Sequence, residues 1–119
     1  MKAALNGHLE TTRQLLIADA AVNLTDKGGY SAMMLAASNN HVEIVELLLN
    51  EGADVDQVEN TNGWTALIWA AKQGHLHTVQ ILLHHQADPD LQDFQGKRAM
   101  DWATDGGFAA IVSLINSSK

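Results

Sequence analysis

The stretch that decides the fold runs from Gly63 to Asp90 and reads GWTALIWAAKQGHLHTVQILLHHQADPD. Thr65 carries the hydroxyl with which an N-cap residue accepts a bond from the first turn of a helix, and a short apolar segment follows it. Gly74 ends that segment, and a second run, with apolar side chains at helical spacing, begins at Leu76. The stretch therefore predicts a loop, a helix, a tight turn, a second helix and an exit into the next loop.

This unit recurs along the chain with a period of 33 or 34 residues. The residue after the turn recurs at intervals of 33, 34 and 33, as His8, His41, His75 and Phe108. The glycines of the loop tip recur at intervals of 34 and 33, as Gly29, Gly63 and Gly96. A period of this length, carrying a turn and two helices, is typical of a stack of helical repeats.

Two segments of the chain carry a family resemblance. SAMMLAASNNHVEIVELLLNEGADVD, residues 31–56, and TALIWAAKQGHLHTVQILLHHQADPD, residues 65–90, resemble the ankyrin pattern TPLHLAAxxGHxxIVxxLLxxGADVN. The resemblance covers nearly the whole chain. It implies an all-α ankyrin-repeat solenoid, in which hairpin-like loops join helix-turn-helix units.

The repeat period predicts a single ankyrin-repeat domain over residues 1–119. Its expected parts are a partial repeat at 1–23, a repeat at 24–56, a repeat with a one-residue loop insertion at 57–90, and a C-terminal capping repeat at 91–119. The partial first repeat indicates either a fragment of a longer array or an end that another element covers. Exposed apolar side chains such as Leu5 and Leu9 would then allow self-association.

The ends of several helices are marked by single residues. Ser31, like Thr65, can cap a first helix, whereas Arg98 at the same position is a poor cap and predicts fraying. Gly52 ends a second helix with the left-handed conformation usual for such a stop. Gln86 stands at the equivalent position, so this helix must end without the freedom of glycine, at a modest cost in stability.

The composition limits the classes of function. Acidic residues outnumber basic ones by 14 to 7, and the net charge of −7 disfavours nucleic acid as a partner. The absence of cysteine excludes disulfides, thiolate zinc sites and a cysteine nucleophile. No run of residues resembles a signal peptide or a membrane span. We therefore expect an intracellular protein, cytoplasmic by default with the nucleus also open, that does not bind membranes.

No motif in the sequence indicates catalysis. G-x-x-x-x-G-K-[ST], G-x-S-x-G and H-E-x-x-H are all absent. His77, His84 and His85 lie close together in the sequence, but surroundings without sulfur and with few carboxylates make a poor metal site. Imidazolium groups near a helix C-terminus are the simpler explanation. We therefore expect no enzyme activity, no metal and no cofactor.

The resemblance also implies roles for two kinds of side chain. In the Gly-His position of the family the ring bonds to the backbone of a neighbouring loop, and His8, His41 and His75 match that position. Asn23 resembles the residue that an asparaginyl hydroxylase modifies in many ankyrin repeats. Ala21 departs from the acidic residue usual two positions earlier, which weakens this second match.

Ankyrin folds bind partners through the hairpin tips and the concave face of the first helices, so the resemblance implies a surface of this kind. Tyr30, Trp64 and Phe94 fall at hairpin tips, and aromatic side chains are the usual anchors of protein interfaces. Trp69 and Trp102 fall on first helices, where burial between repeats is the more ordinary explanation. The candidate partner-binding residues are Tyr30, Asn39, Trp64, Trp69, Lys72, Phe94, Lys97, Trp102 and Asp105.

The lysines on the same surface indicate the charge of the partner. Lys72 and Lys97 would orient an acidic group of the bound protein, although a solvated surface of mixed charge explains them equally well. The sequence thus predicts a non-catalytic protein–protein interaction module. The alternative is a structural spacer or scaffold segment of a larger ankyrin-repeat protein, whose tip aromatics could be replaced without effect on any interaction.

Overall fold

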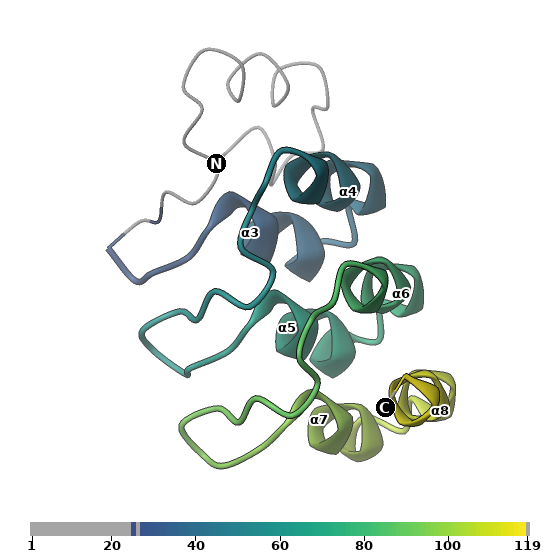
Figure 1. Ribbon diagram of the computed structural model, residues 1–119. Coiled ribbons are helices and arrows are strands. Elements are labelled where there is room, and N and C mark those ends of the chain that lie inside the picture. Colours follow the sequence, from purple (N-terminus) through teal and green to yellow (C-terminus); the bar gives the residue numbers. More distant parts are fainter. Residues whose placement is uncertain (1–24, 26, 119) are drawn as a thin grey trace.

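The computed structural model describes residue 25 and residues 27–118 (Figure 1). The helices of this part of the chain form three consecutive pairs, α3 (Ala32–Ser38) with α4 (Val42–Asn50), α5 (Ala66–Gln73) with α6 (Leu76–His84), and α7 (Ala99–Asp105) with α8 (Ala109–Ser117). The expected all-α solenoid is confirmed. The partial repeat predicted over residues 1–23, which includes Leu5, Leu9 and Asn23, lies outside the described residues.

The helix pairs stack in two rows (Figure 1). The first helices α3, α5 and α7 pack against one another in one row, and the second helices α4, α6 and α8 form the other. The loops before α5 and α7 project away from the second helices and lie side by side with the loop before α3. This arrangement places the three hairpin tips and the first helices on one side of the molecule.

Small side chains allow the first helices to pack closely. Alanine occupies buried positions in all three of them, and larger apolar side chains fill the space between the two rows. Burying each of the larger side chains contributes about 1.5–3 kcal/mol relative to leaving it in water. The buried residues of the first helices are Met33, Met34, Ala36, Ala37, Ala66, Leu67, Ile68, Ala70, Ala71, Ala99 and Ala103.

The caps expected for the first two described repeats are present. Ser31 Oγ accepts a hydrogen bond from the backbone N–H of Met34 at 3.1 Å. Thr65 Oγ1 accepts the equivalent bond from Ile68 at 3.2 Å. Each bond satisfies one of the backbone donors that the first turn of a helix leaves free, which confirms the prediction for both residues.

Helix α7 begins differently. Arg98 makes no side-chain cap, but the carboxylate of Asp101 accepts a hydrogen bond from the backbone N–H of Arg98 at 2.9 Å. This backbone bond, more than the nearby guanidinium, lowers the pKa of Asp101 below its usual value. Helix α7 starts directly after Arg98, as α3 starts directly after Ser31. The missing cap is replaced by an acidic side chain in the first turn.

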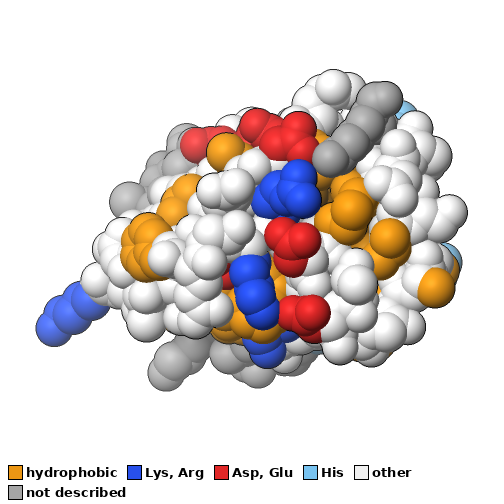
Figure 2. Space-filling model, turned by 90° about the horizontal axis from the view of Figure 1, so that it is seen from below, with side chains coloured by type: hydrophobic (Ala, Val, Ile, Leu, Met, Phe, Trp, Pro, Cys, Tyr) orange, Lys and Arg blue, Asp and Glu red, His pale blue; other side chains and the backbone are white. Residues whose placement is uncertain are grey.

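Asp101 also changes the outer face of the last repeat. It stands where Met34 and Ile68, each 1% exposed, are buried between neighbouring first helices. Figure 2 views the molecule from the α7–α8 end, where acidic and basic side chains alternate beside hydrophobic ones. Arg98 Nε lies 3.5 Å from Asp101 Oδ2, so this face presents charged groups where interior repeats present apolar ones.

The end of α6 provides a test of backbone strain. Gln86 has φ +72°, and Gly52 at the equivalent end of α4 has φ +93°. The left-handed conformation costs a non-glycine residue about 1–2 kcal/mol. We expect Gln86→Gly to raise the free energy of unfolding by about 1 kcal/mol, since added freedom of the unfolded chain offsets part of the gain.

The matched control is Gly52→Ala, measured with Gln86→Gly by urea denaturation followed by circular dichroism. Among the residues that the structure describes, no atom beyond Gly52 and its two chain neighbours lies within 4 Å of the position that a Cβ on Gly52 would take, so we expect the cost to be conformational. We expect Gly52→Ala to lower stability by about the amount that Gln86→Gly raises it. A loss of stability in Gln86→Gly would contradict this explanation.

Candidate functional site

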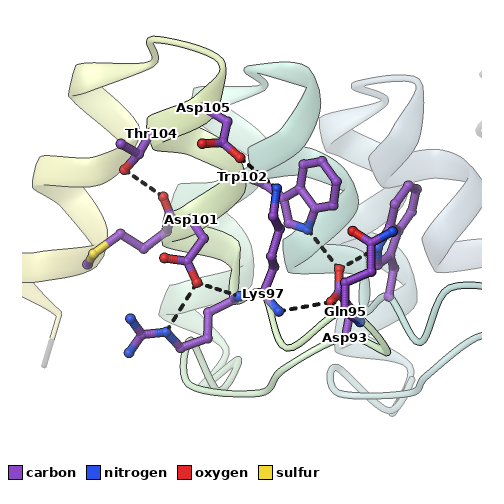
Figure 3. Close-up of polar contacts among 10 residues, drawn as sticks. Asp93, Gln95, Lys97, Asp101, Trp102, Thr104 and Asp105 are labelled. Carbon is purple, nitrogen blue, oxygen red and sulfur yellow. Dashed lines mark hydrogen bonds and ion pairs between the residues drawn. The ribbon is translucent and has the colours of Figure 1, made fainter.

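A buried carboxylate lies at the base of the last hairpin. Asp93 is 6% exposed, and its Oδ1 accepts the backbone N–H groups of Gln95 at 2.8 Å and Lys97 at 2.9 Å. Its Oδ2 accepts the indole N–H groups of Trp64 and Trp102, both at 2.9 Å (Figure 3). Four donors thus surround one carboxylate, which meets the requirement that a buried charge be hydrogen-bonded.

Glu59 has the same role in the preceding hairpin. It is 0% exposed, and its carboxylate accepts the backbone N–H groups of Thr61, Asn62 and Trp64. The side chain of Tyr30 also bonds to it. This hairpin is one residue longer than the last one, and the extra methylene of glutamate lets the carboxylate reach the donors of the longer loop.

These carboxylates connect successive repeats. Tyr30 and Trp64 each follow the tip glycine of their own repeat and bond to the carboxylate of the next repeat, Glu59 and Asp93 respectively. The aromatic side chains after the glycines therefore have an internal partner for their polar atoms. All of Tyr30, Trp64 and the first-helix tryptophans are half-buried and pack against the core.

The polar surroundings keep both acids ionised. Burial, the largest single influence, would raise the pKa of Asp93, but the bonds from the Lys97 N–H, the Trp102 indole and its other donors together lower it below its usual value. The pKa of Glu59 is lowered in the same way, against the effect of burial, chiefly by the backbone N–H of Trp64. Their charges are satisfied within the hairpins and are not presented to a partner.

The hairpin tips also contact one another directly. The backbone N–H of Asn60 donates to Gly28 O at 2.7 Å, and that of Phe94 donates to Asn62 O at 3.0 Å. The Phe94 ring lies on Gly63, where an added Cβ would come within 2.6 Å of Cδ1. Phe94 is nevertheless 68% exposed, so one face of the ring is fixed on the neighbouring tip and the rest is open to solvent.

Four aromatic rings form a row on the hairpin side of the first helices. The Trp69 centroid lies 6.1 Å from Tyr30 and 4.6 Å from Trp64, and Trp64 lies 5.6 Å from Trp102. The two contacts between tryptophans are edge-to-face, which is a favourable geometry for aromatic pairs. The indole N–H of Trp69 is buried, and no acceptor for it lies among the residues that the structure describes.

Two lysines lie over this row of rings. Lys72 Nζ is 5.5 Å from the ring centroids of both Trp64 and Trp102. Lys97 Nζ is 4.3 Å from the Trp102 centroid and also forms an ion pair with Asp105 at 2.8 Å (Figure 3). Both distances to the rings are within the range of cation–π attraction.

The structure thus brings most of the candidate binding residues into one cluster. We call the rings of Tyr30, Trp64, Trp69 and Trp102 the aromatic row, and Lys72 and Lys97 lie above it. Asn39 is not part of this cluster; it lies at the end of α3, where its amide donates to Leu35 O. Sequence reasoning did not single out Glu59 and Asp93. Their common place before the tip glycines was the available signal.

The residue that follows the turn between the two helices of a repeat contacts the preceding repeat, through either a polar or an apolar side chain. His75 Nε2 lies 3.1 Å from Ser38 O in the preceding repeat, which confirms the role expected for this histidine. Phe108 replaces it in the last repeat, and its ring fills the space beside Gly74 and Gly106, where an added Cβ would lie within 2.6 Å of the ring. An apolar contact there takes the place of the polar one.

The second helices carry a hollow lined by histidines. His84 and His85 have their rings 5.6 Å apart and, with Glu46, line a hollow of about 530 Å³ between α4 and α6. Residues 25 and 27–118 contain no group of three metal-binding side chains. Over the same residues, no helix is long and apolar enough to cross a membrane.

The architecture defines a helical repeat protein, and comparison with known proteins gives the family. A model of the ankyrin repeat, covering three copies, matches residues 1–93 and 56–118, so the chain belongs to the ankyrin repeat family. Ankyrin repeats generally mediate protein–protein interaction and are generally non-catalytic.

Two curated proteins illustrate the relationship. The chain is 38% identical over 58 residues to the ankyrin repeat and KH domain-containing protein mask-1 of Caenorhabditis elegans, and 40% identical over 57 residues to palmitoyltransferase akr1 of Schizosaccharomyces pombe. The alignments cover 49% and 47% of this chain but 2% and 9% of those proteins. The chain therefore matches a small part of each.

Trp69 on α5 and Trp102 on α7 occupy equivalent positions, but only Trp102 has an acceptor for its indole N–H among the described residues. Substitutions at the two positions can therefore be compared directly. Trp102→Phe removes a bond to a charged acceptor and should lower the free energy of unfolding by about 1.5–3 kcal/mol. Trp69→Phe removes a buried N–H without an acceptor, so it should change stability by less than about 1 kcal/mol. Equal losses in urea denaturation would contradict the assigned hydrogen bonds.

The Asp93 carboxylate should make stability sensitive to acid. Because its folded pKa is lowered, its contribution is present above the usual pKa and is lost as the pH falls below about 4. Asp93→Asn should lower the free energy of unfolding at neutral pH by at least about 2 kcal/mol. The variant should also lose less stability than the natural chain when the pH is lowered from neutral to acid. The control is Asp105→Asn, at an exposed ion pair, with an expected effect below about 1 kcal/mol.

Proposed function

We propose that the chain is a non-catalytic module that binds another protein through its hairpin tips and the concave face of its first helices. The observation that carries this proposal is Phe94, a large aromatic side chain that is 68% exposed on a tip held by internal bonds. Membership of the ankyrin repeat family supports the same function.

Phe94 is suited to anchor a partner because it is already ordered. Its backbone N–H is bonded to the preceding tip, and its ring rests on Gly63. The neighbouring residue, Asp93, is fixed by four hydrogen bonds. Binding therefore loses little conformational entropy, which is a main cost of forming an interface.

The aromatic row extends this anchor over the first helices. Its rings are half-buried, and those of Tyr30, Trp64 and Trp102 use their polar atoms internally. They would therefore contribute apolar area rather than hydrogen bonds to a partner. Aromatic side chains at such positions are frequent hot spots of binding energy. Asn39 and the Lys97–Asp105 pair are the polar candidates at the border of this surface.

Catalysis is not part of the proposal. The carboxylates nearest the aromatic row, Glu59 and Asp93, are buried and bonded to donors of their own hairpins. They are therefore poorly placed to exchange protons with a substrate. The transferase named among the relatives is matched over 9% of its length, so its activity is not carried over to this chain. A cytoplasmic location remains a prediction from composition.

The test uses peptides selected from a displayed random library against the natural chain. Peptides should bind Phe94→Ala at least about tenfold more weakly, the effect of losing a hot spot of about 1.4 kcal/mol or more. The control Glu46→Ala, on the exposed side of α4, should bind them unchanged, and circular dichroism should show that both variants fold. Equal binding to Phe94→Ala would contradict the assignment of Phe94 as the anchor, whereas failure to select any peptide would favour the alternative of a structural spacer.

A further inference from the structure

We infer that Lys72 is a recognition site for a carboxylate, so that the partner segment is an acidic peptide although the chain itself carries a net charge of −7. The inference rests on the proposed function and specifies the chemistry of the partner. Two observations support it: the described acidic side chains of the hairpins and first helices already have partners within the chain, and the ammonium group of Lys72 lies over the tryptophan rings.

The acidic side chains around the aromatic row are already engaged. Glu59 and Asp93 are buried and accept hydrogen bonds within their hairpins. In the last repeat, the acidic residues pair with basic neighbours, Asp101 with Arg98 and Asp105 with Lys97. Of the hairpin and first-helix acids that the structure describes, none forms an ion pair with Lys72.

Among the described residues, Lys72 is therefore the basic group over the aromatic row whose charge is not paired with a carboxylate. Its Nζ lies 5.5 Å from the rings of both Trp64 and Trp102. The rings attract the ammonium group and favour its position above them without neutralising it. Of the two lysines predicted to orient an acidic group, Lys72 remains available, whereas Lys97 already has Asp105 at 2.8 Å.

Lys72 is linked to Phe94, the proposed anchor, through Trp64 and Asp93. Trp64, one of the rings beneath it, bonds to Asp93, and Asp93 directly precedes Phe94. A partner segment that covers Phe94 and continues along the aromatic row would reach Lys72 with an acidic group. Covering the rings would also exclude water from the ion pair and strengthen it.

The acidic side chains of helix α4 would limit binding to the hairpin side. Glu43, Glu46 and Glu51 are exposed on or beside α4, on the other row of the molecule. An acidic segment would be repelled there and attracted at Lys72, which gives orientation and specificity more than raw affinity. The preference for acidic peptides should therefore weaken as salt increases.

The experiment uses the displayed random peptide library with the natural chain and three variants at one position. Selected peptides should be enriched in Asp and Glu relative to the unselected library. Their binding should fall at least about tenfold in Lys72→Glu, fall less in Lys72→Ala, and largely persist in Lys72→Arg, which keeps the charge. Replacing the required acidic residue of a peptide by Lys should restore its binding to Lys72→Glu.

The possible results separate this inference from the proposed function. Peptides that depend on Phe94 but show no acidic enrichment, and bind Lys72→Glu as well as the natural chain, would overturn the inference and leave the proposed function standing. Acidic peptides that depend on Lys72 but not on Phe94 would support the inference and contradict the anchor. Failure to select any peptide that binds the natural chain would count against both.

Discussion

The fold of the hairpin side depends on burying a carboxylate in each of the hairpins before α5 and α7 and on satisfying it completely. Glu59 and Asp93 accept backbone N–H groups from their own loops and a polar hydrogen from an aromatic side chain of the preceding repeat. An unsatisfied buried charge would be very costly, so loop conformation and aromatic position are fixed together. The surface available to a partner is therefore ordered by interactions within the chain.

This arrangement would allow an acidic protein to bind the acidic partner that we propose. The hairpin carboxylates contribute to the net charge of −7, but their charge is used internally. Lys97 is likewise engaged by Asp105, and Lys72 lies over the rings without a carboxylate of its own among the described residues. Local charge on a repeat surface can thus differ in sign from the total, because pairing and burial determine which charges solvent encounters.

Sequence reasoning found what depends on local pattern and missed what depends on side-chain direction. The period, the Ser31 cap and the strained stop at Gln86 follow from residue type and spacing, and the structure contains each of them. The bond from Trp64 to Asp93 joins residues 29 positions apart and requires the packing of two hairpins, which spacing alone does not give. For the same reason the sequence could not distinguish Lys72 from Lys97.

The most direct measurement is an acid titration of the three indole N–H resonances by NMR, while the spectrum remains that of the folded chain. The resonances of Trp64 and Trp102 should shift together as Asp93 is protonated, with a midpoint below the usual aspartate pKa of about 4. The resonance of Trp69 should stay unchanged. Equal shifts of all three, or a midpoint at or above the usual value, would contradict the claim that the buried Asp93 carboxylate holds its hairpin and the two tryptophans together.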